Sequence, residues 1–435
     1  MLSGWGRVPV VPGRERRSED LPSLSQEMPL ARGLGRAYGD AALPAPGDVE
    51  VAGTALADRI LSFDQTSGLL TAEAGLSLDA MWRYFLPLGF VTPVSPGTRF
   101  VTLGGMVACD VHGKNHHRDG TFGRHVLALT IRTGSGELVS CSRSEHADLF
   151  QATVGGMGLT GIICDVTVRL ARVPSPWIFG DSQRVRDIDG FIDALKSSGT
   201  SWPMTVGWID CLARGRHLGR GVLHRGRWAE KHEAPSQPPG PITGLNLPVE
   251  CPSFVLQPSM VRAFNAAYFR WHAGTGHARI IHPYRFLYPL DAIGHWTRLY
   301  GRRGFTQYQC VLPEEAGHDA ARRFLEVVSR RGGASFLCVI KDCGPEGDGL
   351  LTFPRPGMSI ALDIPMRAMT PDLIDALNEQ VIVEGGRVYL AKDALTKAAH
   401  FREMEPRLDR FLAVRRTWDP DGRIRSAQSV RLFGW

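Results

Sequence analysis

The sequence predicts an α+β protein of two lobes, on three observations. The chain has 435 residues, which exceeds what one hydrophobic core usually serves. Its first third mixes strands and short helices with glycine-rich loops, whereas strands and helices follow one another regularly from Gln307 onward. The second pattern is typical of an antiparallel sheet backed by helices.

The first lobe is predicted to alternate strands with short helices. Residues 69–74 read as a strand, and Ser77 then caps a helix that carries its apolar side chains inward until proline and glycine end it. Residues 126–132 and 137–140 are expected to pair as a hairpin. A helical turn then leads into a glycine cluster, residues 154–161, and a further strand.

Residues 31–40 concentrate glycine at positions 33, 35 and 39. Glycine adopts positive φ and lets main-chain N–H groups approach a bound anion, so such a run favours binding over packing. The spacing is not that of a nicotinamide-binding turn, and prolines shortly after the run exclude a following helix. Taken alone, the run is equally typical of an ordinary surface loop.

A second run of small residues lies between Pro96 and His117. Within it, Thr102 is predicted to cap a helix in which Gly104 and Gly105 allow close approach of a ligand. The first amides of that helix are expected to be free for a pyrophosphate. Two such loops together predict a bound dinucleotide whose diphosphate they clamp.

The second lobe, beyond Pro176, is predicted to be a sheet with covering helices. Residues 204–209 read as a strand, and Thr370 is the expected cap of the last helix, which two glycines end. The other expected elements are strands 307–312, 335–341 and 358–363 and helices 319–330 and 371–383.

Residues 214–248 are rich in glycine, proline and arginine, and they predict a mobile loop. Its basic residues form either a solvated surface or a lid that is attracted to phosphate or to anionic lipid headgroups. These residues are Arg214, Arg216, Arg220, Arg225, Arg227 and Lys231.

Alternation along the second-lobe strands gathers polar side chains on one face. Gln307 and Gln309 share a face of one strand, Ala361 and Asp363 share a face of another, and Lys341 ends a third. If this face turns toward the first lobe, it lines a cleft suited to sugar hydroxyls. If it turns away, it is the solvent side of an ordinary sheet.

Composition narrows the class of partner and the compartment. The net charge of +6 allows an anionic substrate, a membrane surface or nucleic acid, but no nucleic-acid motif accompanies it, so a non-enzymatic nucleic-acid binder is a remote alternative. Eight cysteines form no C-x-x-C pair, and no signal peptide or long apolar stretch occurs, so we expect free thiols and a cytoplasmic location. The histidines within 112–117 lack partners at metal-site spacing, so no metal is expected.

These motifs resemble those of FAD-linked oxidases of the vanillyl-alcohol oxidase superfamily and, more narrowly, those of the decaprenylphosphoryl-β-D-ribose oxidase family. The similarity extends over most of the chain. It is carried by residues 31–40, Pro96-Gly97-Thr98, the run His112-Gly113-Lys114-Asn115-His116-His117, residues 152–162, Gln307-Tyr308-Gln309 and Ala391-Lys392-Asp393.

The resemblance implies a PCMH-type FAD-binding domain built from both chain ends, residues 1–175 and 387–435, with residues 176–386 inserted as a substrate domain. Many relatives attach their flavin through a histidine in the first glycine loop; Arg36 stands at that position here, which implies non-covalent FAD. The residues implied to contact FAD are Ala31, Arg32, Gly33, Leu34, Gly35, Arg36, Ala37, Tyr38, Gly39, Asp40, Ala41, Gly97, Thr102, Leu103, Gly104, Gly105, Cys109, Asp110, Val111, His112, Ile163 and Tyr389.

The activity that the resemblance implies is oxidation of the C2 hydroxyl of the ribose in a polyprenyl-phosphoryl pentose. The resemblance implies that hydride passes to flavin N5. Formation of the keto sugar is then the first half of an epimerisation in cell-wall arabinose biosynthesis. The expected partners are an NAD(P)H-dependent reductase and, through peripheral contact, the inner membrane. The alternative on the same fold is a soluble sugar-alcohol or aldonolactone oxidase.

Such an oxidation needs a group that accepts the hydroxyl proton. Lys392 is the leading candidate if burial or the nearby cations Arg36, Lys114 and Lys341 lower its pKa. Otherwise, Lys392 pairs with Asp393 or stabilises reduced flavin.

The remaining polar candidates are assigned around Lys392. Tyr38 is expected to hydrogen-bond Lys392 or the substrate, or else only to cover the cofactor. His112 is either a rival base or a flavin contact. The residues expected to hold the substrate are Lys114, Trp208, Gln309, Lys341 and Asp363.

Overall fold

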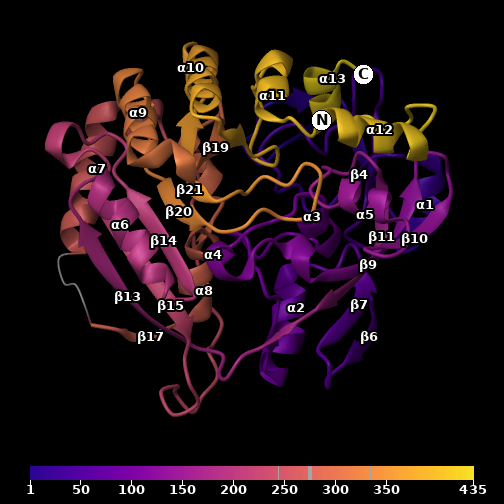
Figure 1. Ribbon diagram of the computed structural model, residues 1–435, viewed down its shortest axis with the longest axis horizontal. Coiled ribbons are helices and arrows are strands. Elements are labelled where there is room, and N and C mark those ends of the chain that lie inside the picture. Colours follow the sequence, from indigo (N-terminus) through magenta and orange to yellow (C-terminus); the bar gives the residue numbers. More distant parts are fainter. Residues whose placement is uncertain (243, 273–276, 334) are drawn as a thin grey trace.

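Two sheets, each with its own set of helices, lie side by side in the computed structural model (Figure 1). The structure describes residues 1–242, 244–272, 277–333 and 335–435. The larger sheet has eight antiparallel strands in the order β17-β13-β15-β14-β20-β21-β19-β22. Their bounds are β13 Ile178–Val185, β14 Met204–Ile209, β15 Gly221–Trp228, β17 Arg279–Ile281, β19 Phe305–Pro313, β20 Cys338–Cys343, β21 Gly357–Pro365 and β22 Arg387–Val388.

Helices α6 (Ile188–Gly199), α9 (Gly317–Arg330) and α10 (Thr370–Val383) cover one face of this sheet (Figure 1). Every residue of the central strands β19 and β21 is buried, which requires that the opposite face is covered as well. The polar side chains Gln307, Gln309 and Asp363 therefore do not face solvent. Of the two interpretations of this face, the one in which it turns toward the first lobe is confirmed.

The smaller sheet has five antiparallel strands in the order β10-β9-β11-β7-β6. Strands β9 and β10 pair as the predicted hairpin. A three-stranded parallel sheet, β3-β5-β4, lies beside it. The bounds are β3 Arg14–Arg17, β4 Ala31–Arg32, β5 Glu50–Gly53, β6 Ile60–Asp64, β7 Leu69–Glu73, β9 Val126–Thr133, β10 Leu138–Ser142 and β11 Gly161–Arg169. The helices are α1 Leu21–Glu27, α2 Leu78–Phe85, α3 Leu103–Ala108, α4 His116–Asp119 and α5 Ala147–Thr153.

The C-terminal helices return to the first lobe, so that both chain ends lie close together (Figure 1). Helix α12 packs against α5, and the amide of Ala427 donates to the carbonyl of Leu43 at 2.9 Å. The limits 175 and 386 of the inserted domain stay predictions; β22 lies at the second limit and pairs with β19. The last helices are α11 Ala398–Met404, α12 Leu408–Trp418 and α13 Ala427–Phe433.

The remaining elements are short pieces at the edges, apart from helix α7. The strands are β1 Leu2–Ser3, β2 Val10–Val11, β8 Phe90–Val91, β12 Ala171–Arg172, β16 Leu245–Asn246 and β18 Ile293–Gly294, and the helices are α7 Pro258–Trp271 and α8 Pro283–Leu287.

Local signals in the sequence predicted most of these elements. The α+β class is confirmed, and so is the cap Ser77, whose side chain accepts from the amide of Ala80. The cap at Thr370 is wrong, because helix α10 begins at that residue and its hydroxyl instead donates to the carbonyl of Pro365. The sequence therefore identified the start of the helix to within one residue but not the carbonyl, five residues earlier, that accepts from the Thr370 hydroxyl.

The prediction of one mobile loop over residues 214–248 is wrong for its first half. Residues 221–228 form β15, an internal strand that pairs with β13 along its whole length and with β14 over residues 221–226. Two of the arginines that suggested a solvated surface instead pair with carboxylates of the same lobe. Arg220 donates to Asp210 at 2.9 Å, and Arg225 donates to Asp181 at 2.6 Å. Residue 243, within the same interval, lies outside the described residues.

An arginine of helix α13 joins the two chain ends. The Arg431 guanidinium donates to both oxygens of Asp40, at 2.9 and 2.7 Å, and to Asp393 at 2.8 Å. Both carboxylates are buried. The interaction therefore holds the first glycine loop against the segment that carries Lys392.

We expect Arg431→Met to lower the free energy of unfolding by roughly 3 kcal/mol, because it leaves two buried carboxylates without their cation. Urea unfolding of the purified protein measures the change. The control is Arg425→Met, which breaks the exposed pair with Asp48 and should cost less than about 1 kcal/mol. Equal losses in the two variants would contradict the assignment.

Candidate functional site

A cavity of about 1630 Å³ lies between the two lobes. This volume exceeds the roughly 300–1,000 Å³ of an ordinary small-molecule site, so it has room for a dinucleotide and a second ligand. Of the predicted site residues, those that line it are Ala31, Gly33, Leu34, Gly35, Arg36, Ala37, Tyr38, Ala41, Gly97, Thr102, Gly104, Gly105, Cys109, Val111, His112, Lys114, Ile163, Trp208, Gln309, Lys341, Asp363, Tyr389 and Lys392.

Five predicted contact residues lie behind this lining. Arg32 donates to the carbonyl of Ser3 at 2.8 Å, Leu103 is fully buried, and Asp40 binds Arg431. Gly39 packs against the main chain of Asp393, and Asp110 faces away toward another loop. These residues support the loops that line the cavity, and direct contact of their side chains with a cofactor stays a prediction.

The first glycine loop presents main-chain amides to the cavity. The N–H groups of residues 34–37 have no acceptor within the described part of the chain, and Gly35 at its centre has φ +63°. Consecutive amides around a left-handed residue form an anion-binding concavity. The guanidinium of Arg36 lies 3.8 Å from the ring centroid of Trp5 and donates to the carbonyl of Phe100.

The second loop lines the cavity but has no free amides at the start of its helix. Thr102 caps α3 as predicted, its hydroxyl accepting from the amide of Gly105. The prediction that the first amides of α3 are free is wrong, because Leu103 and Gly104 donate to the carbonyls of Leu76 and Ala74, both at 2.8 Å. The free amides that suit a diphosphate are therefore those of the first loop.

The glycines of these loops fit a bulky planar group against the main chain. A Cβ on Gly33 would stand 2.4 Å from the hydroxyl of Thr102, so glycine is needed where the two loops touch. A Cβ on Gly97 or Gly158 would meet no protein atom within 4 Å, and both residues line the cavity. The loops thus leave open space at the main chain where a cofactor would lie, and the residues present fit FAD.

Lys392 enters the cavity beside the first loop. The amide of Tyr38 donates to the carbonyl of Ala391 at 2.9 Å, and the Lys392 ammonium lies 4.0 Å from the centroid of the Tyr38 ring. Asp393 binds Arg431, so the alternative in which Lys392 pairs with Asp393 is wrong. Burial, reinforced by Lys341 and opposed by Asp363, lowers the pKa of Lys392 to about 8.

Two further lysines line the same cavity. Burial lowers the pKa of Lys341 to about 8. Burial and the charge of Lys341 lower the pKa of Lys114 to about 7, and its ammonium donates to the carbonyl of Leu287 at 2.8 Å. Three buried amines in one cavity favour an anionic ligand, because a negative charge would restore their protonation.

His112 is held between two polar side chains. Lys341 Nζ lies 2.8 Å from Nδ1 of His112, and the side-chain amide of Gln309 lies 3.1 Å from Nε2. Burial and the charge of Lys341 hold the pKa of His112 well below its ordinary value. The imidazole is therefore neutral, and the lysine already uses one of its nitrogens, which weakens the case for His112 as the base.

Asp363 and Trp208 have partners of their own. Burial raises the pKa of Asp363 to about 6, while hydrogen bonds from Gln307 at 2.5 Å and Tyr300 at 3.1 Å limit the rise. Trp208 donates from its indole to the carbonyl of Phe336, and its ring centroid lies 4.5 Å from that of Tyr268.

Sequence reasoning missed the α7 side of the cavity. Met260, Phe264, Tyr268 and His272 of α7 line it, and His224 of β15 faces the same space. The signal was Pro258 followed by apolar residues at intervals of three and four, which is typical of a helix that begins with proline.

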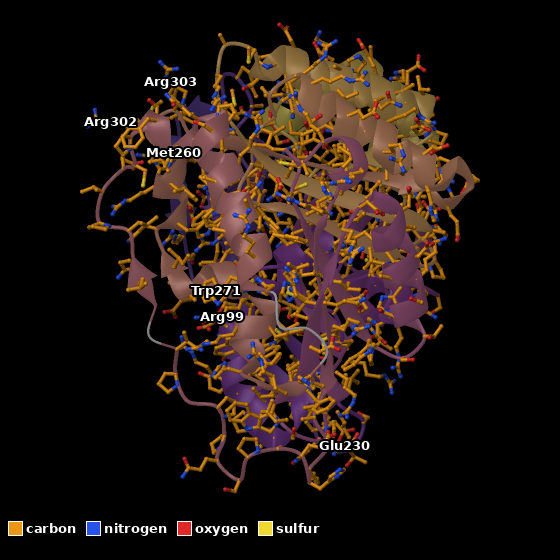
Figure 2. The ribbon with its side chains drawn as sticks, turned by 90° about the vertical axis from the view of Figure 1, so that its left-hand side faces the viewer. Arg99, Glu230, Met260, Trp271, Arg302 and Arg303 are labelled. Carbon is orange, nitrogen blue, oxygen red and sulfur yellow. The ribbon has the colours of Figure 1, made fainter. Side chains whose placement is uncertain are left out.

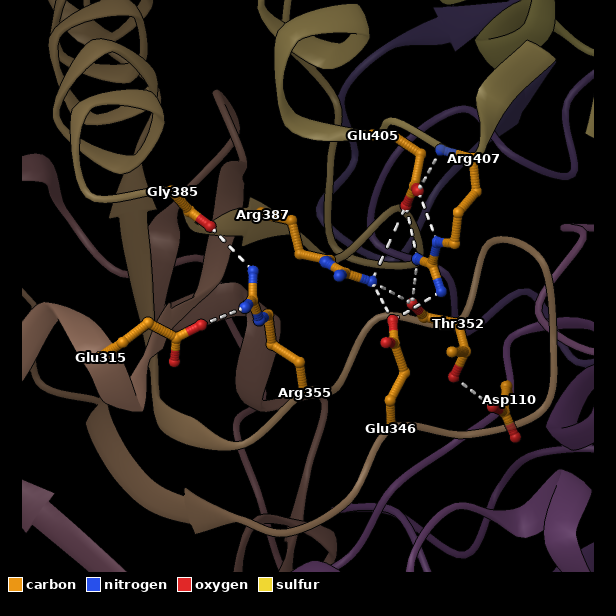
Figure 3. Close-up of polar contacts among 9 residues, drawn as sticks. All are labelled: Asp110, Glu315, Glu346, Thr352, Arg355, Gly385, Arg387, Glu405 and Arg407. Carbon is orange, nitrogen blue, oxygen red and sulfur yellow. Dashed lines mark hydrogen bonds and ion pairs between the residues drawn. The ribbon is translucent and has the colours of Figure 1, made fainter. Parts of the chain in front are cut away.

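A loop that includes Glu346 and Thr352 connects Asp110 to the segments that carry Arg387 and Arg407 (Figure 3). The hydroxyl of Thr352 donates to Asp110, which also accepts from the amide of Gly123 at 2.8 Å. The carbonyl of Thr352 accepts from Arg387 and Arg407, which share Glu346 and Glu405. This network fixes Asp110, and with it the main chain that leads to His112.

Comparison with known proteins decides the family. Residues 26–142 match the model of the FAD binding domain. Decaprenylphosphoryl-beta-D-ribose oxidase of Mycolicibacterium smegmatis is 36% identical over an alignment that covers 99% of this chain and 97% of the relative. The chain belongs to the decaprenylphosphoryl-β-D-ribose oxidase family of FAD-binding proteins.

Other relatives agree with this placement. A protein of Streptomyces coelicolor described only by its position in the mprA 5' region is 30% identical over 82% of this chain and the whole of that protein. L-gulonolactone oxidase of Scyliorhinus torazame is 29% identical, but over only 26% of this chain and 25% of the relative. The resemblance inferred from the motifs is thus confirmed, and the chain is an FAD-dependent oxidoreductase.

Two further structural observations concern partners. No helix among the described residues has the length and hydrophobicity that crossing a membrane requires. Within the same residues, no group of three or more His, Cys, Asp or Glu side chains is placed to hold a metal ion.

We expect Gly33→Ala to lose bound FAD while the fold is retained, because the added methyl group forces the first loop away from Thr102. The ratio of flavin to protein absorbance after gel filtration measures occupancy, and circular dichroism checks the fold. Gly240→Ala is the control, since a Cβ there meets no atom within 4 Å. A Gly33→Ala protein with full flavin content would refute the role of this contact.

Proposed function

We propose that this enzyme oxidises the C2 hydroxyl of the pentose in a polyprenyl-phosphoryl sugar to a ketone. The observation that carries the proposal is Lys392, a buried amine with a lowered pKa in a cavity that two further lysines make cationic. Such a cavity suits a sugar that carries a phosphodiester and a hydroxyl to be deprotonated. The name of the Mycolicibacterium relative specifies a substrate of this class.

Lys392 is the proposed proton acceptor. An amine accepts a proton only in its neutral form, and a pKa near 8 makes that form accessible close to neutral pH. The ring of Tyr38 lies against the ammonium and stabilises its charged form once the proton has been taken up. Burial of the Tyr38 hydroxyl raises its own pKa, so this residue positions the lysine rather than acting as the acid or base.

The other polar groups are proposed to orient the sugar. Gln309 and Asp363 lie on neighbouring strands of the buried sheet face, and their side-chain oxygens supply acceptors for hydroxyl groups. Lys114 and Lys341 provide point charges for the phosphodiester. Trp208 supplies an apolar wall on the side of the cavity that faces α7.

FAD would be held by the amides of residues 34–37 and by the surfaces at Gly97 and Gly105, and when bound it supplies the hydride acceptor. We propose that it binds without a covalent bond, because Arg36 stands where many relatives carry the linking histidine. Cys109 and Tyr389 both line the cavity, and the Tyr389 hydroxyl donates to the Cys109 carbonyl at 2.9 Å.

A ketone at C2 is the intermediate of an epimerisation, so we propose that a reductase that uses NAD(P)H consumes the product. A lipid-linked substrate also requires access to a membrane surface, which we propose is the cytoplasmic face of the inner membrane.

The decisive experiment is anaerobic addition of a prenyl-phosphoryl pentose to the FAD-loaded protein while the visible spectrum is recorded. Loss of the yellow colour with this substrate supports the proposal. Unchanged colour with it, but bleaching by free polyols or aldonolactones, would instead establish the alternative of a soluble sugar oxidase.

We expect Lys392→Met to keep its FAD but to slow flavin reduction by about 100- to 10,000-fold, the usual contribution of a general base. In the unchanged enzyme, the reduction rate should rise as pH passes upward through about 8, because deprotonation produces the active amine. Stopped-flow absorbance measures both effects.

Lys341→Met provides a further test of the same electrostatic assignment. It removes a neighbouring positive charge, so the pKa of Lys392 rises and the midpoint of the pH profile should move to higher pH. Lys397→Met, an exposed lysine paired with Asp375, is the control and should leave the profile unchanged. A Lys392→Met enzyme with a near-normal rate would remove the residue from the mechanism.

A further inference from the structure

Helix α7 carries an apolar stripe on its exposed side. Met260, Phe264, Ala267 and Trp271 recur at intervals of four, three and four residues, which places them on one helix face. Their larger members are exposed: Met260 by 47%, Phe264 by 46% and Trp271 by 84%. The fully buried residues of this helix are Val261 and Asn265, and Tyr268 packs against Trp208 beside them.

Neighbouring segments extend this apolar surface. Phe254 lies in the turn that contacts α7, Ile293 lines the same cavity as Met260, and Leu245 pairs with Ile293. All three are exposed, Leu245 by 81%. Single exposed apolar residues are ordinary, but a group of this kind around one helix marks an interaction site. We call this group, together with the α7 stripe, the docking face.

The docking face is also cationic. Residues 251–303 contain seven arginines and one acidic residue, Asp291, so this segment carries a net charge equal to the +6 of the whole chain. Six of the arginines are exposed, and none of these six forms an ion pair with a carboxylate in the part of the chain that the structure describes. They are Arg262, Arg270, Arg279, Arg285, Arg302 and Arg303.

Four of these arginines lie near the apolar stripe: Arg279 and Arg285 line the same cavity as Met260 and Phe264, and Arg302 and Arg303 lie beside Met260. Figure 2 shows Met260 and Trp271 on the face toward the viewer, with Arg302 and Arg303 beside Met260 and Glu230 at the far lower end. The acidic groups close to the face are neutralised, since Glu250 binds Arg7 at 2.9 Å and Asp291 lies 3.7 Å from Arg99.

The docking face borders the mouth of the catalytic cavity. Met260, Phe264, Tyr268 and His272 line the cavity from α7, and Arg279 and Arg285 line it from the adjoining segment. A surface that sits against this face therefore lies directly at the entrance to the space that holds Lys392.

We propose that the docking face binds the surface of a bilayer that contains anionic phospholipids. A helix that exposes Trp, Phe and Met on one side with arginine around them has the composition of an interfacial helix. Unpaired arginines select anionic headgroups, whereas a protein partner that fits only the apolar stripe would leave their charges without a counterpart. The role of this binding in catalysis rests on the proposed lipid-linked substrate. The binding itself does not, because it requires no substrate.

This arrangement gives the lipid-linked sugar a short path to the active site. With the docking face on the headgroups, the cavity mouth opens toward the bilayer, and a sugar phosphate at the surface enters while its polyprenyl chain stays in the lipid. The apolar residues at the mouth then cover the first part of that chain.

The test is co-sedimentation of the full-length, FAD-loaded protein with phosphatidylcholine vesicles, with and without phosphatidylglycerol. We expect binding only with the anionic lipid, and we expect it to weaken as salt is raised. Trp271→Ser should reduce binding about tenfold. Arg302→Gln/Arg303→Gln should reduce it by at least as much, since each arginine near the surface contributes about fivefold.

The matched controls lie on other parts of the molecule. Leu138→Ser removes an exposed apolar residue of β10, and Arg169→Gln/Arg416→Gln removes two exposed charges from β11 and α12. Both should bind vesicles as the unchanged protein does. No binding of the unchanged protein to anionic vesicles, or equal losses in test and control variants, would overturn the proposal.

Two further readouts separate the inference from its rivals and from the proposed function. If Trp271→Ser converts a dimer into a monomer in light scattering while vesicle binding is absent, the face covers a second copy and the proposal is wrong. Flavin reduction by a water-soluble, short-prenyl sugar phosphate should be equal in Trp271→Ser and the unchanged enzyme, whereas reduction by substrate embedded in anionic vesicles should be slower in the variant. Failure of both substrates to bleach the flavin would refute the proposed function, yet vesicle binding would still be measured.

Discussion

The contact between the first glycine loop and the segment around Lys392 is the constraint on which the site depends. The main chains touch at Tyr38 and Ala391, and a Cβ on Gly39 would stand 2.0 Å from the carbonyl of Asp393. Residues more than 350 positions apart are thereby fixed next to one another. Arg431 binds a carboxylate on each of the two segments, Asp40 and Asp393. Because the lysine follows the touching residue directly, its position relative to the cofactor loop is set by main-chain packing rather than by a flexible side chain.

The electrostatic character of the cavity follows from this placement. Burial lowers the pKa of each lysine, and the charge of Lys341 lowers the pKa of Lys114 and of Lys392 further. Asp363 offsets only part of the repulsion at Lys392, since its own carboxyl is buried and its pKa is raised. Because their pKa values are lowered, these lysines can accept protons near neutral pH. They lie where an anionic substrate that releases a proton would bind.

The sequence was informative where structure is local and uninformative where it is tertiary. The caps at Ser77 and Thr102, the hairpin and the helices α9 and α10 follow from residues within a few positions of each other, and these were predicted. Strand β15 was missed because its glycines and arginines read as a loop. Only its main-chain pairing with β13 and β14, to which the ion pair of Arg225 with Asp181 adds, makes a strand of them. Likewise, no local signal shows that the amides of Leu103 and Gly104 are taken by the carbonyls of Leu76 and Ala74.

The two sides of the cavity differ in how firmly they are held, and this difference bears on how substrate enters. The cofactor side consists of loops pinned by main-chain contacts, by Thr102 and by the Asp110–Thr352 bond. On the opposite side, α7 is held by the buried residues Val261 and Asn265, of which Asn265 donates to Asp210 at 2.8 Å, and by aromatic contacts of Phe264 with Phe336 and of Tyr268 with Trp208. Most residues of α7 are nonetheless partly or fully exposed, whereas every residue of β19 and β21 is buried. Buried main-chain contacts therefore fix the geometry of the chemistry on one side, while the other side presents exposed apolar side chains where a bulky lipid-linked ligand would enter.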